Sequence, residues 1–129
     1  MISHPPHYNH GKYEHAEVAI AWKLGGLLYN ATKYICRAGH KGDASDDLRK
    51  AIWYLEREIK LLKTGEEFGL AKQCTVPGYI PNLVAQDWSL SPNLTLALKQ
   101  IYSCESIRGV GRLETAVNLI KARIDLLTP

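Results

Sequence analysis

Residues 45–63 read SDDLRKAIWYLEREIKLLK, and this stretch decides the fold class. Its apolar side chains recur at steps of four, three, four and three residues, at Leu48, Ile52, Leu55, Ile59 and Leu62. That spacing places them along one side of a helix of about four turns. Ser45 can cap the helix, and acidic residues in the first turn favour its dipole. The stretch predicts a long amphipathic helix that ends before Gly65.

Before this helix the chain is broken twice. Adjacent prolines at positions 5 and 6 predict an extended N-terminal arm. A short helix is expected from about Tyr13 to Lys23, where Gly25 and Gly26 interrupt it. A second helix is expected over 27–38, with Gly39 as its C-terminal cap.

After the long helix, Pro77, Gly78 and Pro81 oppose a long helix in residues 66–90, so we expect a linker with a short turn there. Ser91 followed by a proline predicts the start of another helix. Two glycines, Gly109 and Gly111, mark the next turn, and a last helix is expected from about 112 to 127.

The two halves of the chain resemble each other. The apolar stripe of residues 48–62 recurs in residues 113–127 at an offset of 65, and Asn30 and Asn93 stand at similar distances upstream. Either the chain contains a tandem pair of helical hairpins, or two ordinary amphipathic helices align by periodicity alone. We predict an all-α helical bundle in one domain over 1–129, with a short N-terminal helix and an extended arm, and with two tandem hairpins in the first of these alternatives. The hairpin of residues 91–129 is expected to be scaffold.

Composition narrows the class of protein. The net charge of +3 is too small to argue for a nucleic-acid partner. No apolar run reaches membrane-spanning length. Three cysteines, Cys36, Cys74 and Cys104, lack metal-site spacing and are expected to be free thiols in a reducing, cytoplasmic compartment. Because 129 residues support only a small core, we expect a homo-oligomer.

A strip of polar donors follows one face of the second predicted helix. At 100° per residue, Lys33, Tyr34 and Arg37 lie within about 60° of Asn30. Lys41 continues the strip into a loop with two glycines, before the next helix N-terminus. Arginine and lysine without a nearby acid suit phosphate oxygens, although such a strip can also be a solvated surface.

The third predicted helix and the acidic residues add candidates. Lys50 and Tyr54 follow Asp47 at helical steps, and Trp53 faces away from the core. Such a tryptophan can stack on a base, or be buried by another subunit or by the C-terminal hairpin.

Acidic residues suggest a metal. Glu14 and Glu17 form an E-x-x-E pair, and with Asp43, Asp46 or Asp47 they could hold Mg²⁺ against a polyphosphate. The aspartates can equally serve the helix N-terminus alone.

Taken together, these motifs resemble a family. They are His4-Pro5-Pro6-His7-Tyr8, Gly11-x-x-Glu14, Asn30-x-x-Lys33-Tyr34-Ile35-x-Arg37-Ala38-Gly39-x-Lys41-Gly42 and Asp47-Leu48-x-Lys50-Ala51-x-Trp53-Tyr54-Leu55. Residues 3–62 resemble a small domain of tailed bacteriophages, long of unknown function, with one branch described as a nucleotide kinase. The resemblance implies a nucleotide ligand and the cytoplasm of an infected bacterial host. By position it indicates His7, Tyr8, Glu14, Asn30, Lys33, Tyr34, Arg37, Lys41, Asp47, Lys50, Trp53 and Tyr54.

The resulting expectation is phosphoryl transfer to a nucleoside monophosphate. Lys33, Arg37 and Asp47 would be catalytic. His7, Tyr8, Asn30, Tyr34, Lys41, Lys50, Trp53 and Tyr54 would bind the ligand. One alternative is a protein that sequesters a host nucleotide or nucleotide signal. Another is an all-helical nucleoside triphosphate pyrophosphohydrolase, which Glu14 and Glu17 fit but Asp43-x-x-Asp46 does not.

Overall fold

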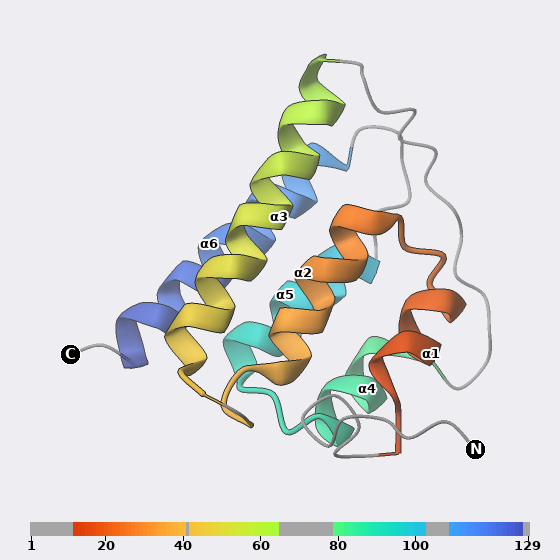
Figure 1. Ribbon diagram of the computed structural model, residues 1–129, viewed down its shortest axis with the longest axis vertical. Helices are drawn as coiled ribbons and strands as arrows, with labels where there is room; N and C mark the ends of the chain where they lie inside the picture. Colours follow the sequence, from red (N-terminus) through yellow and green to blue (C-terminus); the bar gives the residue numbers. More distant parts are fainter. Residues whose placement is uncertain (1–11, 41, 65–78, 103–108, 128–129) are drawn as a thin grey trace.

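Helices make up the regular structure of the described part of the chain. The computed structural model describes residues 12–40, 42–64, 79–102 and 109–127 (Figure 1). Within those ranges there are six helices and no strands: α1 His15–Ala21, α2 Gly26–Arg37, α3 Ala44–Thr64, α4 Pro81–Asp87, α5 Pro92–Tyr102 and α6 Val110–Leu127. The predicted all-α class is confirmed.

Two hairpins form the main bundle. In Figure 1, α2 runs antiparallel to α3, and α6 runs antiparallel to α3 on its other side. Packing is most extensive between α2 and α3, between α5 and α6, and between α3 and α6. The shared core contains fully buried side chains from both hairpins, including Ile35, Leu48, Leu55, Leu113 and Ile120. Helix α3 therefore joins the two hairpins.

The long helix α3 follows the predicted stripe. Leu48, Ile52, Leu55 and Ile59 are buried. The expected cap was wrong, because Ser45 lies inside the first turn. Asp43 precedes the helix instead, and its Oδ1 accepts a hydrogen bond of 2.8 Å from the Ser45 backbone N–H.

A second, smaller core lies beside the bundle. Helices α1 and α4 bury Val18, Trp22, Val84 and Trp88 there, together with the Cys36 thiol of α2. The expectation of a linker was wrong for the described residues 79–90. Pro81 is the first residue of α4. The backbone N–H at this position makes no hydrogen bond within a helix, so proline, which has no N–H, is accommodated there. Residues 65–78 lie outside the described part.

Glycines were weaker guides to helix boundaries than expected. Helix α1 ends at Ala21, before the glycines, and Gly26 is the first residue of α2. Gly111 lies inside α6 rather than in the preceding turn. Gly39, in contrast, adopts a positive φ of 86° after α2, as a C-terminal cap requires.

Two further observations concern the cysteines and whether a helix could cross a membrane. Burial raises the pKa of the Cys36 thiol to about 12, so it stays protonated. Cys36 is not in a disulfide, whereas Cys74 and Cys104 lie outside the described residues. Among the described helices, none combines the length and apolar character needed to cross a membrane.

Candidate functional site

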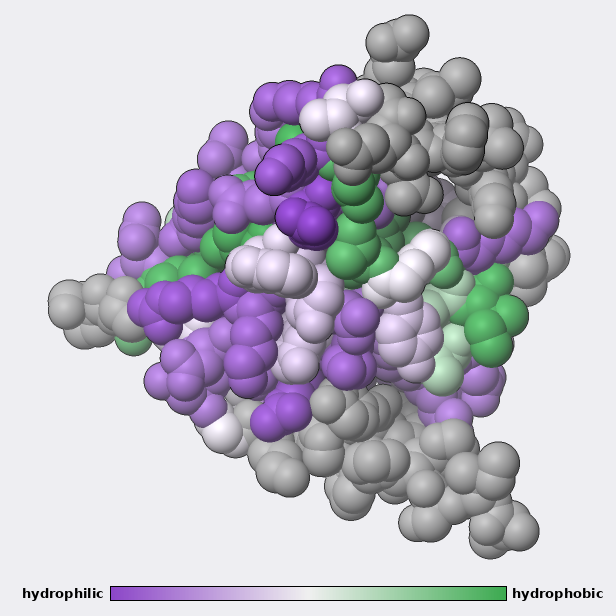
Figure 2. All heavy atoms as spheres, turned by 45° about the horizontal axis from the view of Figure 1, so that its top comes forward, coloured by the Kyte–Doolittle hydropathy of each residue, from purple (hydrophilic) through white to green (hydrophobic). Residues whose placement is uncertain are grey.

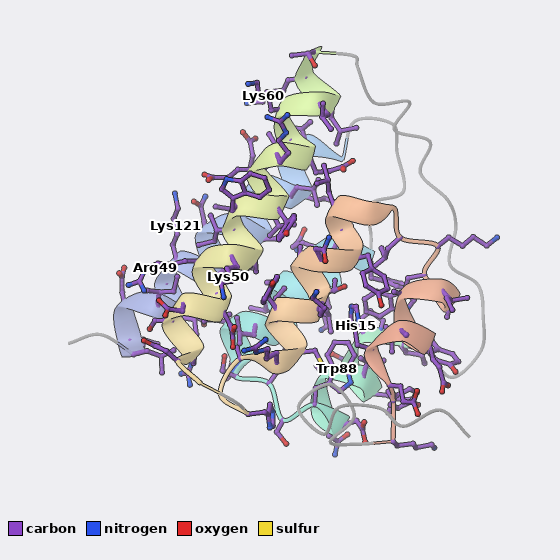
Figure 3. All side chains as sticks on the ribbon, in the orientation of Figure 1. His15, Arg49, Lys50, Lys60, Trp88 and Lys121 are labelled. Atoms are coloured by element: carbon purple, nitrogen blue, oxygen red, sulfur yellow. The ribbon has the colours of Figure 1, made fainter. Side chains whose placement is uncertain are left out.

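A pair of stacked tyrosines joins the outer edges of α2 and α3. The rings of Tyr34 and Tyr54 lie 6.0 Å apart and nearly parallel, at 11°. Two ammonium groups approach the Tyr34 ring, Lys33 Nζ at 5.0 Å and Lys50 Nζ at 5.4 Å from its centroid. Lysines from different helices thus converge on one aromatic ring, a geometry that cation–π attraction favours. Figure 3 shows Lys50 on α3, near α2.

Trp53 extends this aromatic surface outward. Its ring packs edge-on against Tyr54 at 5.0 Å, and 59% of the residue is exposed. The C-terminal hairpin therefore does not bury Trp53, which corrects one of the two ways in which we expected it to be covered. We name Lys33, Tyr34, Lys50, Trp53 and Tyr54 the aromatic–lysine cluster.

An ion pair lies close to this cluster along the same two helices. Arg37 Nε of α2 is 3.5 Å from Asp47 Oδ1 of α3, and their side chains are 24% and 3% exposed. Burial raises the pKa of the Asp47 carboxyl, and the positive charges of Arg37 and Lys50 partly oppose that shift. Asp47 thus pairs with an arginine whose side chain remains partly exposed although its Nε atom is buried.

The second carboxylate oxygen of Asp47 is unusual. Oδ2 is buried, and it has no hydrogen-bond partner among the described residues. A buried acceptor of this kind costs about 1–3 kcal/mol, more when it is charged. Functional sites are one place where such costs persist.

Three predicted ligand-binding residues, His7, Tyr8 and Lys41, lie outside the described part. Asn30 lies on α2 one turn before Lys33, and its Nδ2 donates a 3.2 Å hydrogen bond to the Gly26 carbonyl of the same helix.

The predicted metal pair lies at the start of α1. Glu14 precedes this helix, and Glu17 Oε2 accepts a 3.3 Å hydrogen bond from the Tyr79 hydroxyl. In the ranges that the structure describes, no group of three or more His, Cys, Asp or Glu side chains is placed to hold a metal ion. These residues therefore do not fit a Mg²⁺ site by themselves.

A buried histidine, which the sequence pattern did not single out, lies between α1, α2 and α4. The ring of His15 packs on Tyr29 at 4.7 Å and lies near Trp88, as Figure 3 shows. Its Nε2 is 2.8 Å from Thr32 Oγ1, whose hydroxyl is also 3.0 Å from the Leu28 carbonyl. Because that hydroxyl donates to a carbonyl, His15 Nε2 must donate to the hydroxyl. Burial, and secondarily Lys33, lower the pKa of His15 to about 4.

A groove of about 700 Å³ lies elsewhere, between α3 and α6. Lys60, Lys63, Glu114 and Lys121 are among its lining residues, and the Lys63–Glu114 ion pair of 3.1 Å spans the two helices. None of the predicted site residues lines it. Figure 2 shows that hydrophilic side chains cover much of the face seen when the top of Figure 1 comes forward. The mixed charge of the groove gives it no defined ligand chemistry.

Comparison with known proteins bears on the N-terminal half. Residues 2–56 match the family described as a protein of unknown function (DUF3310). No curated protein matches the chain, and no solved structure does. The matched segment contains every predicted site residue and ends within α3, before α4, α5 and α6 begin. The chain is thus similar to this family in the half that carries the aromatic–lysine cluster and the Arg37–Asp47 pair.

Proposed function

We propose that the outer face of α2 and α3 binds a nucleotide, and that the protein transfers the terminal phosphoryl group of a nucleoside triphosphate to a nucleoside monophosphate, which leaves two nucleoside diphosphates. The observation that carries the proposal is the convergence of Lys33 and Lys50 on Tyr34, close to Arg37. Cations and aromatic rings are the two chemistries that a nucleotide requires, for its phosphates and its base.

The phosphates would bind the cations. Lys33 and Arg37 are separated by one turn of α2, and Lys50 approaches from α3. Arginine offers a planar fork to phosphate oxygens and lysine a compact charge. During transfer, the same groups would stabilise the charge on the equatorial oxygens of the phosphoryl group.

The base would bind the aromatic side chains. Trp53 is 59% exposed and Tyr54 packs against it, so a flat ring has a surface on which to stack. Stacking of a base on an aromatic side chain is worth about 1–3 kcal/mol.

Asp47 would position Arg37 rather than contact the reacting atoms. Its side chain is 3% exposed, too little for direct attack on a bound ligand, and its Oδ1 holds Arg37 Nε. A fixed guanidinium loses less side-chain entropy when a phosphate binds.

Sequestration without turnover is the second candidate. The absence of a converging acidic group in the described residues favours it over hydrolysis. A pyrophosphohydrolase would need Asp43 and Asp46 as its second acidic pair. Asp43 instead accepts a hydrogen bond from the Ser45 N–H, and Asp46 forms an ion pair with Arg49.

Product analysis separates the three activities. The protein is incubated with mixed nucleoside mono- and triphosphates and Mg²⁺, and products and retained ligands are identified by chromatography. New diphosphates support the kinase, monophosphate with pyrophosphate supports the hydrolase, and retained but unchanged nucleotide supports sequestration. A protein that neither binds nor converts any nucleotide refutes the proposal.

Two lysine variants locate the site. Lys50→Ala should weaken nucleotide binding by roughly tenfold or more, as expected for a charge-assisted hydrogen bond. Lys60→Ala is the matched control, because Lys60 is also exposed on α3 but lines the α3–α6 groove. Equal losses in the two variants would argue against the α2–α3 face.

A further inference from the structure

The short helices α1 and α4 are built alike. Both contain seven residues, and each is followed by a buried tryptophan, Trp22 or Trp88, which lie 66 residues apart. The next residue in each case has a positive φ, 55° at Lys23 and 59° at Ser89. Neither residue is glycine or asparagine, the usual types in that conformation. A shared irregularity at matching positions is not a consequence of helical periodicity.

The hydrogen bonds that end these helices also correspond. After α1, Leu24 N donates to Ala19 O at 3.0 Å, and after α4, Leu90 N donates to Ala85 O at 3.0 Å. Bonds of 3.1 Å from the residues with positive φ accompany both. The sequences Val18-Ala19-x-x-Trp22-x-Leu24 and Val84-Ala85-x-x-Trp88-x-Leu90 agree at every named position.

The two units contact each other reciprocally. Trp22 Nε1 donates to the Tyr79 carbonyl at 2.8 Å, and Trp88 Nε1 donates to the Tyr13 carbonyl at 2.7 Å. Tyr13 and Tyr79 are themselves 66 residues apart, and their rings meet edge to face at 5.5 Å. When residue i contacts j′ and its counterpart i′ contacts j, the interface is isologous, as in a two-fold dimer.

The long helices extend the correspondence. The buried residues of α3, such as Leu48 and Leu55, correspond at an offset of 65 to those of α6, such as Leu113 and Ile120. These two helices pack against each other and run antiparallel (Figure 1), the arrangement that a two-fold axis perpendicular to both helices produces.

We propose that this chain is a fused pseudo-dimer, in which residues 79–127 are a diverged second copy of the unit formed by residues 13–64. The second copy occupies the position of a partner subunit. The surface of the first unit that contains Tyr13, Trp22 and the α3 stripe is therefore a surface for another copy of the same unit. The family match, which stops at residue 56, covers one unit only.

The tryptophan register changes the alignment of the two halves. It pairs Asn30 with Leu96 and Lys33 with Lys99, so the correspondence of Asn30 with Asn93 expected from the sequence was out of register by three residues.

In this register the second copy keeps the surface of the site but, apart from Lys99, not its chemistry. Gln100, Thr115 and Leu119 stand where the first copy has Tyr34, Lys50 and Tyr54. Their exposure corresponds pair by pair: half-buried, exposed and half-buried. Arg112 stands in place of Asp47. The pseudo-dimer therefore has one nucleotide site per chain, a conclusion that rests on the proposed function.

A graft tests the equivalence of the two faces. The triple variant Gln100→Tyr, Thr115→Lys and Leu119→Tyr is dialysed against an equimolar mixture of ribo- and deoxyribonucleoside monophosphates, and bound nucleotide is counted per chain. At saturating nucleotide we expect one for the wild type and two for the graft, with the second bound more weakly because the graft supplies no counterpart of Arg37 or Trp53. The control places the same residue types on exposed positions of α4, as Leu83→Tyr, Gln86→Tyr and Asn82→Lys, and should bind one. A folded graft that still binds one nucleotide overturns the equivalence.

A copy replacement tests the pseudo-dimer independently of binding. In this variant, residues 79–127 are replaced by a second copy of residues 13–62. We expect the replacement to assemble to the same number of chains as the wild type by light scattering and to unfold in one cooperative thermal transition, because the copied Tyr13 and Trp22 restore the reciprocal contacts. A chain without a cooperative transition overturns the proposal. A wild type that binds no nucleotide, while the replacement folds, refutes the proposed function alone.

Discussion

Asp47 should make the folded state less stable as the pH rises. Burial raises the pKa of this carboxyl above its ordinary 3.8. The folded state therefore binds the proton more tightly than the unfolded state does. The contribution of Asp47 to the free energy of unfolding is most favourable below pH 3.8 and is lost as the pH rises through the raised pKa. At pH 7 the free energy of unfolding of Asp47→Asn should exceed that of the wild type by about 1 kcal/mol. The difference should shrink as the pH falls toward 4. Urea unfolding at both pH values measures this, and a variant less stable than wild type at pH 7 would contradict it.

His15 should act in the opposite direction. Its pKa falls from 6.5 to about 4 in the folded protein, so its contribution is complete above pH 6.5 and is lost as the pH falls from 6.5 to 4. The loss amounts to roughly 3 kcal/mol over that range. His15→Gln, which keeps a donor for Thr32, should lack this part of the pH dependence. Identical pH profiles for the two proteins would show that His15 does not titrate in this way.

Arg37 is expected to matter for binding and little for folding. Its side chain is 24% exposed and lies off the core stripe. Arg37→Ala should weaken nucleotide binding by about 1.5–3 kcal/mol in calorimetry while the helical circular dichroism stays unchanged. Arg57→Ala, an exposed arginine on the outward side of α3, serves as the control. Unchanged affinity in the Arg37 variant would remove this residue from the site.

At the scale of elements, two glycines should respond in opposite ways to the same substitution. Neither Gly39 nor Gly111 has an atom within 4 Å of an added Cβ, so sterics with neighbours do not decide the outcome. Gly39 has a φ of 86°, where an L-residue is strained, and Gly39→Ala should cost about 1 kcal/mol. Gly111 is helical, and Gly111→Ala should stabilise by roughly 0.5–1 kcal/mol. Thermal unfolding of both variants tests the contrast, and a shift in the same direction would contradict it.

The elements also show what local sequence can predict. The apolar stripe of α3 could be predicted from the sequence because its period matches that of a helix that buries one face. Helix α4 was missed because Pro81 and its neighbours resemble a linker, while its stability comes from Trp88 and contacts with residues 75 positions away. The signal that finds α4 is the recurrence of Val-Ala-x-x-Trp-x-Leu, which needs comparison within the chain rather than periodicity.

The candidate site, like the fold, could be predicted from the sequence only in part. A helical projection groups Lys33 with Arg37 on α2, and Lys50 with Tyr54 on α3. It does not determine how two helices are rotated against each other. The stacking of Tyr34 on Tyr54, and the pairing of Arg37 with Asp47, depend on that rotation, which the packed core sets.

For the whole molecule, the exposed Trp53 keeps the prediction of a homo-oligomer open to a direct test. At 59% exposure it is a large apolar side chain outside the core. We expect light scattering to show an oligomer that Trp53→Ala dissociates, whereas Ile20→Ala, at a residue 75% exposed on α1, leaves it intact. A monomeric wild type would assign Trp53 to ligand stacking alone.

The reciprocal tryptophan contacts set the order in which the protein can fold during synthesis. Trp88 donates to a carbonyl 75 positions earlier, and Trp22 to one 57 positions later. The ribosome adds about 5–20 residues per second, so the first unit waits several seconds before its acceptor and its covering helices are made. During that interval Trp22, and the part of the α3 stripe that packs on α6, lack their cover. The nascent chain should therefore recruit chaperones that bind apolar segments until α4 and α6 have left the ribosome.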